Sequence, residues 1–284
     1  MNSNVLLPFC SIVIVSYNPD RRLLDNIKVL VNIESLKDII LVDNSTCNNV
    51  YVNECACFEK LKLIRCGENK GIAYAQNMGV KESMSKGYKW VLTLDHDTIV
   101  TKQLLQKYYD YIKSHDCSHI ALLNTDYYDI GAQKNHLNIS FPVEVKEVIS
   151  SGSLLNVEAF MNLGGMKEFY FIDQVDNEYC FRAIKHGYKI VVLPGVDMEH
   201  RLGKTTVVKL FNKKFYLYNQ SPIRTFYRTR NIVYFLREYR EIKMIKEKTR
   251  FLLVDFIKIL LEERTMQKIS CFIRGLYHGF FDKI

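Results

Sequence analysis

Val91-Leu-Thr-Leu-Asp95-His96-Asp97 is an apolar run of strand length that ends in two carboxylates. A buried strand of this kind delivers both acids into a polar turn. Hard divalent cations prefer such oxygens, and Mg²⁺ is usually held by one or two carboxylates together with substrate phosphates. The stretch therefore predicts a metal site at a strand end, although Asp-x-Asp alone is also common in ordinary turns.

Other apolar runs recur along the chain and alternate with segments of helical period. This alternation is typical of an α/β domain whose mainly parallel sheet is flanked by helices. The predicted strands are residues 11–17, 38–43, 62–66, 90–94 and 119–123, and the predicted helices are residues 23–32, 72–85 and 102–114. Thr98 or Thr101 is a suitable N-cap for the third helix.

Polar residues follow three of these strands at the point where each strand ends. In a parallel sheet the carboxyl ends of the strands meet at one edge, and ligands bind in the crevice outside that edge. We therefore expect one crevice built from three clusters, which are Tyr17-Asn18-Pro19-Asp20, Asp43-Asn44-Ser45 and Asp95-His96-Asp97.

The stretch from Asn69 to Gly79, which includes Gly71 and Asn77, places a turn before a helix with several small residues. Small residues permit close backbone approach, either to a ligand or to the sheet on which an ordinary helix packs. Neither G-x-G-x-x-G nor G-x-x-x-x-G-K-[ST] occurs, which disfavours a Rossmann dinucleotide site and a P-loop. Phosphates, if bound, must rely on a metal and on side chains.

The pattern becomes less regular after residue 125. It predicts a loop to Asn138, strands at residues 137–141 and 145–150, a helix at residues 176–186 and a strand at residues 188–193. Asp173, Asp176 and Glu178 open that helix, where acids either complement the helix dipole or supply a general base. His200 follows the last strand and is either structural or a metal ligand beside carboxylates.

Basic residues are concentrated near the C-terminus. Residues 201–284 contain 19 basic and 7 acidic groups, net +12, whereas residues 1–200 contain 20 and 24, net −4. Residues 206–284 have the spacing of two or three amphipathic helices, which we expect to form a region apart from residues 1–205. Their basic face is either solvated or lies on anionic lipid. Nucleic acid is not expected, because no nucleic-acid-binding motif accompanies the charge.

The composition of the 284 residues, 48% hydrophobic and 25% charged, is that of a folded protein. The eight cysteines are scattered without the spacing of zinc sites, which favours a reducing compartment. Residues 1–10 lack the pattern of a signal peptide, and residues 251–261 are too short and too charged to span a bilayer. We therefore expect a cytoplasmic protein.

Taken in order, these motifs resemble the family 2 inverting glycosyltransferases, which have the GT-A fold, over about residues 10–205. The resemblance implies a divalent cation, Mg²⁺ or Mn²⁺, on the diphosphate of a nucleotide-sugar donor. It implies that Asp176 is the catalytic base. The remaining implied roles are donor binding by Tyr17, Asn18, Asp43, Asn69, Gly71, Asn77 and Asp95, and metal binding by Asp95, Asp97 and His200.

Within that family, residues 171–180 and 227–231 are similar to bacterial rhamnosyltransferases of O-antigen or capsule assembly. This implies dTDP-L-rhamnose as donor, with a UDP-hexose or UDP-galactofuranose as alternatives. It also implies a glycan or polyprenyl-diphosphate-linked acceptor at the anionic inner face of the plasma membrane. The sequence departs from the family at His96, where Gln or Asp is more usual, and in its Asp-Asn-Glu acidic motif, so Asp173 competes with Asp176 as base.

The reaction implied is a single displacement at the anomeric carbon, with most of the acceleration supplied by positioning and electrostatics. Two other classes of protein fit part of the pattern. A sugar-nucleotide-binding module would keep Asp43, Asp95 and Asp97 but need no base. A glycoside hydrolase would use paired carboxylates and no nucleotide.

Overall fold

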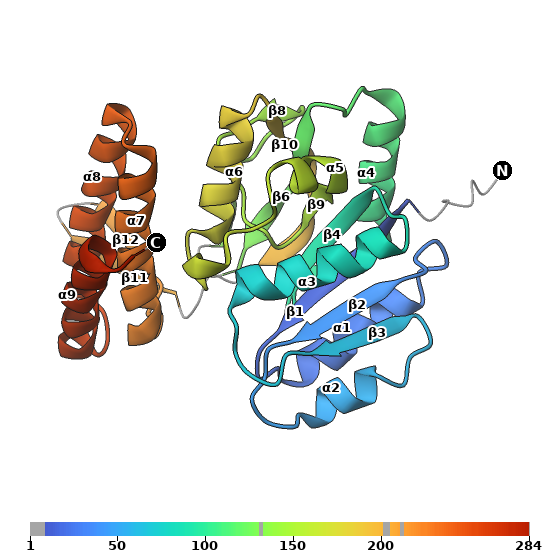
Figure 1. Cartoon of the computed structure of the whole chain (residues 1–284), viewed down its shortest axis with the longest axis horizontal. Helices are drawn as coiled ribbons and strands as arrows, with labels where there is room; N and C mark the ends of the chain where they lie inside the picture. The colour runs from blue at the N-terminus through green and yellow to red at the C-terminus, as the bar shows by residue number, and fades with distance from the viewer. Residues whose placement is uncertain (1–8, 131–132, 201–204, 211–212, 284) are drawn as a thin grey trace.

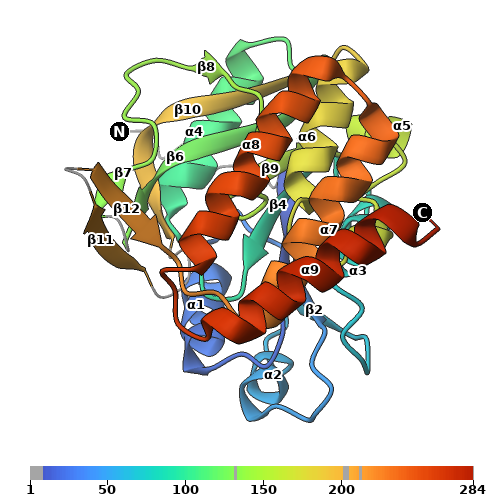
Figure 2. The same ribbon diagram turned by 90° about the vertical axis from the view of Figure 1, so that its left-hand side faces the viewer.

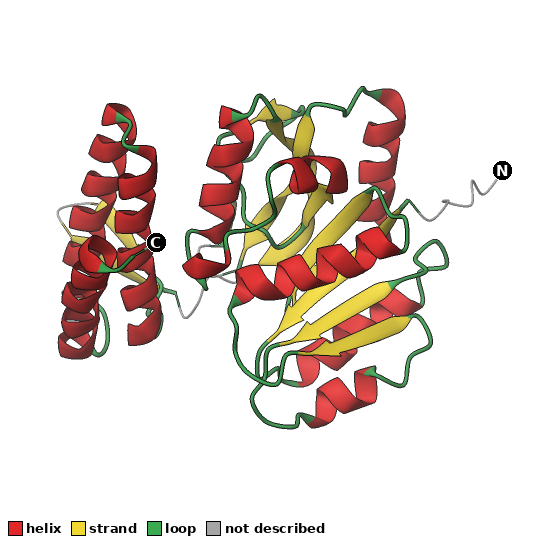
Figure 3. Cartoon of the chain, in the orientation of Figure 1, coloured by secondary structure: helices red, strands yellow, loops and turns green. Residues whose placement is uncertain are grey.

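The computed structural model describes residues 9–130, 133–200, 205–210 and 213–283. One mixed sheet forms the centre of the molecule, and helices cover it on both sides (Figures 1 and 3). The strands of this sheet are β1 (Cys10–Ser16), β2 (Ile39–Asp43), β3 (Leu61–Arg65), β4 (Trp90–Asp95), β5 (Ile99–Val100), β6 (Ile120–Asp129), β7 (Lys134–Asn135), β8 (Val143–Glu144), β9 (Ser153–Asn156) and β10 (Lys189–His200).

The helices of the same part of the chain are α1 (Arg21–Val31), α2 (Val50–Cys55), α3 (Ile72–Ser85), α4 (Lys102–Ser114), α5 (Val157–Asn162) and α6 (Val175–Lys185), with a 3₁₀ turn at Glu168–Tyr170. The predicted helices 72–85 and 102–114 are confirmed at both ends, and 23–32 and 176–186 are confirmed within two residues. Thr101, one of two predicted caps, accepts a hydrogen bond from the N–H of Leu104 (3.4 Å) and is the N-cap of α4.

The main path of the sheet runs β3-β2-β1-β4-β9-β6-β10-β5, with β7 on β6 and β8 on β10. The pairs of β1 with β2 and β4, β2 with β3, and β6 with β10 are parallel, as predicted. The sequence analysis missed β9, which is antiparallel to both of its neighbours. Four residues are too few to display a clear period, and the apolar pattern of the preceding loop instead predicts a strand at residues 145–150.

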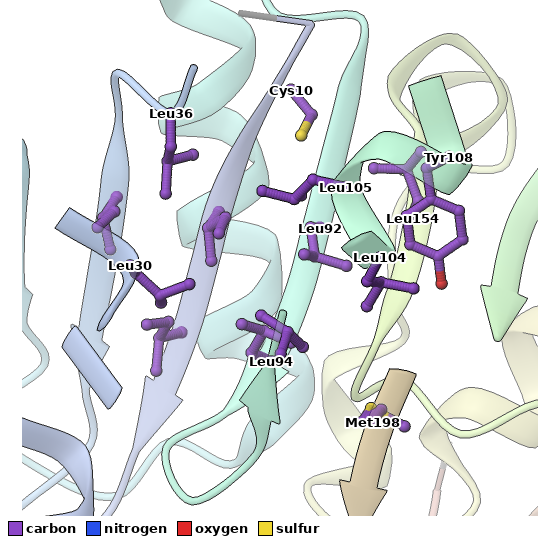
Figure 4. Packing of buried hydrophobic residues seen from close by; sticks show 14 of the residues in the cluster. Cys10, Leu30, Leu36, Leu92, Leu94, Leu104, Leu105, Tyr108, Leu154 and Met198 are labelled. Carbon is purple, nitrogen blue, oxygen red and sulfur yellow. The ribbon is translucent and has the colours of Figure 1, made fainter. Parts of the chain in front are cut away.

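Strand β1 is the centre of the N-terminal half. Six of its seven residues are buried, as expected for a parallel strand covered on both faces. Ile12 and Ile14 pack with α1, α2 and α4 on one face, and Val13 packs with α3, α5 and α6 on the other. Figure 4 shows the first of these two clusters, which contains Cys10 and leucines of α1, β4 and α4. The sheet is therefore packed between two hydrophobic cores, one on each of its faces.

Gly79 of α3 lies directly over Val13. A Cβ at this glycine would stand 2.3 Å from Cγ1 of Val13, closer than non-bonded atoms approach. The absence of a side chain thus allows α3 to lie close against β1. The hydroxyl of Ser11 donates to that of Ser83 across the same contact (2.7 Å). This close packing fixes the position of α3, whose N-terminus borders the candidate site.

The predicted strands at residues 137–141 and 145–150 are wrong. The backbone N–H groups of Leu137 and Asn138 donate to the carboxylate of Asp126 (2.9 and 2.7 Å), so a side chain takes the place of a strand ladder. Only the two-residue strands β7 and β8 form in this region of the described chain. Strand β10 also runs past the predicted end at Leu193, because it continues through register shifts around Val196.

The C-terminal region begins with a hairpin, not with the expected helix. Strands β11 (Thr206–Leu210) and β12 (Lys213–Leu217) pair antiparallel, in keeping with the β-branched run that starts at Thr206. Helices α7 (Pro222–Tyr239), α8 (Ile242–Ile259) and α9 (Thr265–Phe281) follow, as predicted in number. They pack beside α6, with α8 and α9 outermost (Figures 1 and 2).

Helices α7 and α9 approach closely through two glycines. A Cβ at Gly275 would lie 2.7 Å from the carbonyl oxygen of Phe226, and one at Gly279 would lie 2.6 Å from Cβ of Val233. Because glycine is at both positions, the two helices pack with almost no space between them. α9 thereby holds α7 against the body of the molecule.

Candidate functional site

Parallel pairing brings three strand ends to one level. Ser16 is in register with Asp43 of β2, and Val15 with Asp95 of β4. A cleft of about 500 Å³ opens there, between these ends, the start of α3, the loop before α6 and the start of α7. It is lined by seven of the residues for which the sequence predicts a catalytic, donor-binding or metal-binding role, which are Tyr17, Asn69, Gly71, Asp95, Asp97, Asp173 and Asp176.

Asp43 lies beneath the cleft and is almost fully buried. Its carboxylate accepts hydrogen bonds from the hydroxyls of Ser16 (2.8 Å) and Ser45 (2.7 Å), and Arg65 lies 3.8 Å away. Ser45 in turn accepts from the N–H of Asn18 (2.8 Å), whose backbone is left-handed. Asp43 and Asn18 therefore shape the strand-end turns, and their contact with a nucleotide stays a prediction.

The turn before α3 is held from both sides. Asn44 donates to the carbonyl of Gly71 (3.0 Å), and Asn69 accepts from the N–H of Gly71 (3.1 Å). Gly71 has φ +85°, and a Cβ there would lie 2.5 Å from the carbonyl oxygen of Phe171. Glycine is therefore required, because the start of α3 packs against the loop that leads to α6. Asn44, which belongs to the predicted strand-end cluster but has no predicted role in donor binding, also lines the cleft.

Asn77 is not among the residues that line this cleft. Its amide donates to the carbonyl of Met166 (2.9 Å) and to Glu168 (2.8 Å), and its oxygen accepts from the N–H of Met166 (2.8 Å). These bonds tie α3 to the segment before α6. The structure therefore gives Asn77 a structural role, and the donor contact implied by the resemblance stays a prediction.

Asp95 and Asp97 both face the cleft on either side of His96. The N–H of Asp95 donates to the hydroxyl of Ser151 (3.0 Å), and the carboxylate of Asp97 lies 3.4 Å from Arg22. No group of three or more His, Cys, Asp or Glu side chains within the described ranges could hold a metal by itself. The donor set of two carboxylates nevertheless suits a cation whose remaining ligands are phosphate and water oxygens.

His200 ends β10, where its backbone is in register with Asp129. Its side chain lies outside the part of the structure that is described. Its role as a metal ligand stays a prediction.

The loop before α6 has an unusual backbone. Phe171, Asp173 and Gln174 all have positive φ, between 62° and 65°, although none is glycine. Such conformations persist only when the surroundings impose them, and they are frequent at active sites.

The buried side-chain amide of Asn231 on α7 stabilises this backbone conformation. Its nitrogen lies within hydrogen-bonding distance of three carbonyl oxygens, those of Tyr170 (2.7 Å), Ile172 (2.8 Å) and Asp173 (2.8 Å).

The three acids of this region have different surroundings. Glu178 is fully buried and binds Arg182 through both carboxylate oxygens (2.8 Å each), so it is structural. Asp173 forms a bidentate pair with Arg224 of α7, which also lines the cleft. Both carboxylates are thus engaged by arginines. Asp176 accepts a hydrogen bond from the N–H of the adjacent Asn177 (2.9 Å).

Removal from bulk water raises the pKa of Asp176 from 3.8 to about 6, and the nearby charges of Asp173 and Glu147 act in the same direction. The hydrogen bond from Asn177 opposes this shift but is the weaker effect. A carboxyl group whose pKa lies near the working pH is well matched to accept a proton from a hydroxyl. This distinguishes Asp176 from Asp173, whose oxygens are occupied by Arg224.

Sequence reasoning missed Arg224 and Asn231 as site residues. Both lie on α7, about 50 residues after the loop that they contact, and nothing in their local pattern indicates that contact. The resemblance did single out residues 227–231, a stretch that ends at Asn231.

Comparison with known proteins identifies the family. Residues 11–171 match the sequence model of the family described as "Glycosyl transferase family 2". A curated protein, the "dTDP-rhamnosyl transferase RfbF" of Shigella flexneri, is 32% identical over 255 residues, which cover 84% of this chain and 81% of that protein.

Solved structures share the fold at lower identity. S. aureus TarS has a TM-score of 0.56 at 16% identity over 96% of this chain, which spans 44% of the TarS chain. A shorter TarS chain in complex with UDP-GlcNAc has a TM-score of 0.55 at 15% identity, and the match covers 72% of that TarS chain. GalNAc-T7 with UDP, GalNAc and Mn²⁺ has a TM-score of 0.58 at 14% identity, over 84% of this chain and 50% of that one. With the predicted GT-A fold confirmed, the chain belongs to glycosyl transferase family 2.

Proposed function

We propose that this glycosyltransferase moves L-rhamnose from dTDP-L-rhamnose to a glycan or a polyprenyl-diphosphate-linked glycan in surface polysaccharide synthesis. The observation that carries the donor assignment is the 32% identity to a dTDP-rhamnosyl transferase along most of both chains. The cleft supports it, because carboxylates, a buried strand-end turn and Arg224 surround a space fit for a nucleotide diphosphate. Residues 1–205 would form the catalytic part and residues 206–284 a basic region whose first helix completes the cleft.

In the proposed reaction, Asp176 takes the proton of the acceptor hydroxyl as that oxygen attacks the anomeric carbon. Tyr17, Asn69 and Gly71, which line the cleft, would contact the nucleotide. A divalent cation at Asp95 and Asp97, with His200 as a further ligand, would neutralise charge on the departing diphosphate. Arg224 is placed to add to that neutralisation from α7.

A donor panel tests the function. With Mn²⁺ present, we expect release of nucleoside diphosphate from dTDP-L-rhamnose to be faster than from UDP-GlcNAc or UDP-galactofuranose, because the curated relative that is 32% identical is a dTDP-rhamnosyl transferase. A chromatographic assay of the released nucleotide measures it. If a UDP-sugar is turned over faster, that sugar nucleotide is the donor and the assignment of dTDP-L-rhamnose is wrong. Tight binding of a nucleotide sugar without turnover would indicate a binding module, and cleavage of an oligosaccharide without nucleotide would indicate a hydrolase.

The pH profile tests the base. With the pKa of Asp176 at about 6, kcat/KM should fall as the pH drops below 6, because the protonated carboxyl cannot accept a proton. Asp176→Asn should lower turnover by about 10² to 10⁴ and abolish this acidic limb while nucleotide affinity is kept. Asp173→Asn is the control, and it should retain the limb. If the limb disappears in Asp173→Asn and survives in Asp176→Asn, the roles are reversed.

Loss of folding does not confuse that experiment. Folding raises the pKa of Asp176, so the folded state favours the protonated carboxyl over the ionised one. The stability gained from this proton is complete below pH 3.8 and is lost as the pH rises to about 6. Asp176→Asn should therefore not lower the free energy of unfolding at pH 7.

Asp97→Ala tests the cation. We expect it to abolish the part of dTDP affinity that depends on Mn²⁺, measured by calorimetric titration with and without the ion, because one of two carboxylate ligands is lost. Asp25→Ala, which removes an exposed carboxylate of α1, is the matched control and should leave that dependence unchanged. Mn²⁺-dependent affinity that persists in Asp97→Ala excludes this residue as a ligand.

We also propose that α8 and α9 lie on the anionic inner face of the plasma membrane. None of the described helices has the length and apolar character needed to cross a bilayer. Large apolar side chains nevertheless remain exposed on both helices, and Arg250, Arg264 and Arg274 lie among them. We call this surface the α8–α9 face; it comprises Leu253, Ile257, Leu260, Met266, Ile273, Tyr277, Phe280 and Phe281.

The spacing of the α9 residues supports an interfacial helix, since positions 266, 273, 277 and 280 share one side at 3.6 residues per turn. Apolar groups entering the headgroup boundary and basic groups near it, each contributing about 1 kcal/mol, favour anionic lipid over neutral lipid. The positive charge of residues 201–284 has the sign that such a surface attracts.

Vesicle flotation tests this. The chain should float with vesicles containing phosphatidylglycerol and far less with pure phosphatidylcholine. Ile273→Ser/Phe281→Ser should reduce flotation strongly, whereas Val29→Ser/Phe141→Ser, which changes equally exposed residues elsewhere, should not. Wild-type chain that stays unbound as a dimer would assign the α8–α9 face to a second copy instead.

A further inference from the structure

A second cavity, of about 440 Å³, lies behind the donor cleft between α6, α8 and the edge of the sheet. It is distinct from the cleft, but Ile149 and Asn177 line both. Its volume is in the range of small-molecule sites, and like such sites it combines apolar walls with a few polar groups.

The walls of this cavity are held in place by hydrogen bonds. Asn124 donates to the carbonyl of Ile149 (3.0 Å), which fixes the loop between the cavity and the cleft. His136 stacks on Tyr127 with ring centroids 4.7 Å apart. Phe181 and Phe235 meet edge to face at 5.1 Å on the opposite wall. The cavity is thus a built feature of the fold, with aromatic rings on two sides.

The partition between the two spaces consists of side chains. Asn177 donates to Glu147, and Lys248 of α8 donates to Gln174 (3.0 Å), with Gln174 on the cleft side and Lys248 on the cavity side. The candidate base Asp176 lies at this partition, next to Asn177. A molecule in the cavity would therefore lie close to the carboxylate that must receive the acceptor proton.

We propose that this cavity is the acceptor subsite and binds sugar rings of the acceptor glycan, an assignment that rests on the proposed function. Aromatic faces pack against the C–H faces of sugars, and carboxylates and amides bond to hydroxyls. The cavity supplies both, with Glu147, Asn177, Glu241 and Glu247 as the polar groups. Its charged lining balances three lysines against three glutamates, which suits a neutral ligand better than a second nucleotide.

The cavity also gives the acceptor a direction. Asn177, Phe181 and Ile184 follow one another along one side of α6, and Ile184 is about 12 Å from Asp176 at 1.5 Å per residue. The opposite wall is the first part of α8, at Met244, Glu247 and Lys248. The same helix carries the α8–α9 face further along. Because Glu241 pairs with Lys185 and Lys248 bonds to Gln174, α8 runs antiparallel to α6, so the α8–α9 face lies past the end of the cavity nearest Asp176. A lipid-anchored acceptor would therefore reach the base first and place its further sugar rings in the cavity.

The experiment fills the cavity with a larger side chain, introduced from one wall or from the other. Ile184→Trp on α6 and Met244→Trp on α8 add volume at positions that are not fully buried, so folding is preserved. Val29→Trp is the control, since Val29 is an exposed β-branched residue of α1. The probes are methyl glycosides of rhamnose, glucose and N-acetylglucosamine, which lack the alkyl chain that could bind the α8–α9 face. Saturation-transfer NMR in the presence of dTDP reports binding.

The proposal expects wild-type protein and Val29→Trp to transfer saturation to the ring protons of at least one glycoside. Both cavity variants should bind it about tenfold or more weakly, while dTDP affinity is unchanged. No transfer in the wild type, or equal transfer in both cavity variants, would overturn it. The dTDP titration is read separately, so failure of the donor assignment and failure of the cavity assignment are distinguishable.

Discussion

The register of β1 with its two neighbours is the constraint on which the rest of the molecule depends. Because β2 and β4 both pair parallel to β1, Asp43 and Asp95 reach the same edge of the sheet on either side of Ser16. A slip of one residue would turn each strand over and exchange its two faces between the two cores. Gly79 and the Ser11–Ser83 hydrogen bond then bring α3 to a fixed place above β1. The apolar strand that packs the core thereby also positions the acids.

The opposite wall of the cleft depends on a different contact. The left-handed backbone before α6 is held by hydrogen bonds from the amide of Asn231 and by the close packing of Gly71 against Phe171. Helix α7 therefore forms part of the cleft wall, although it belongs to the basic C-terminal region. Arg224 of the same helix occupies Asp173 and so leaves Asp176 as the carboxylate with an adjustable proton. Packing of α9 on α7 through Gly275 and Gly279 supports this arrangement from outside.

The sequence predicts the parts of this structure that rest on local pattern. Continuous apolar runs identify the parallel strands, small residues and caps identify α3 and α4, and the topology rule brings the strand-end residues Tyr17, Asp95 and Asp97 together. Short antiparallel strands such as β9 have too few residues for a period. The strands β11 and β12 lie among segments of helical spacing, so the pattern of the whole region predicts helix there. The contacts of Arg224 and Asn231 with the loop before α6 could not be predicted, because they arise only when α7 docks on a segment far away in sequence.

The single displacement proposed for this enzyme, assisted by Asp176, is tested most directly by the stereochemistry of the product. One attack on the anomeric carbon from the side opposite the diphosphate inverts the configuration of the transferred sugar. The one-bond carbon–proton coupling at the anomeric centre of the product, compared with that of the nucleotide sugar, measures this. We expect the opposite anomer. A product with the donor's own configuration would contradict the mechanism and the role given to Asp176.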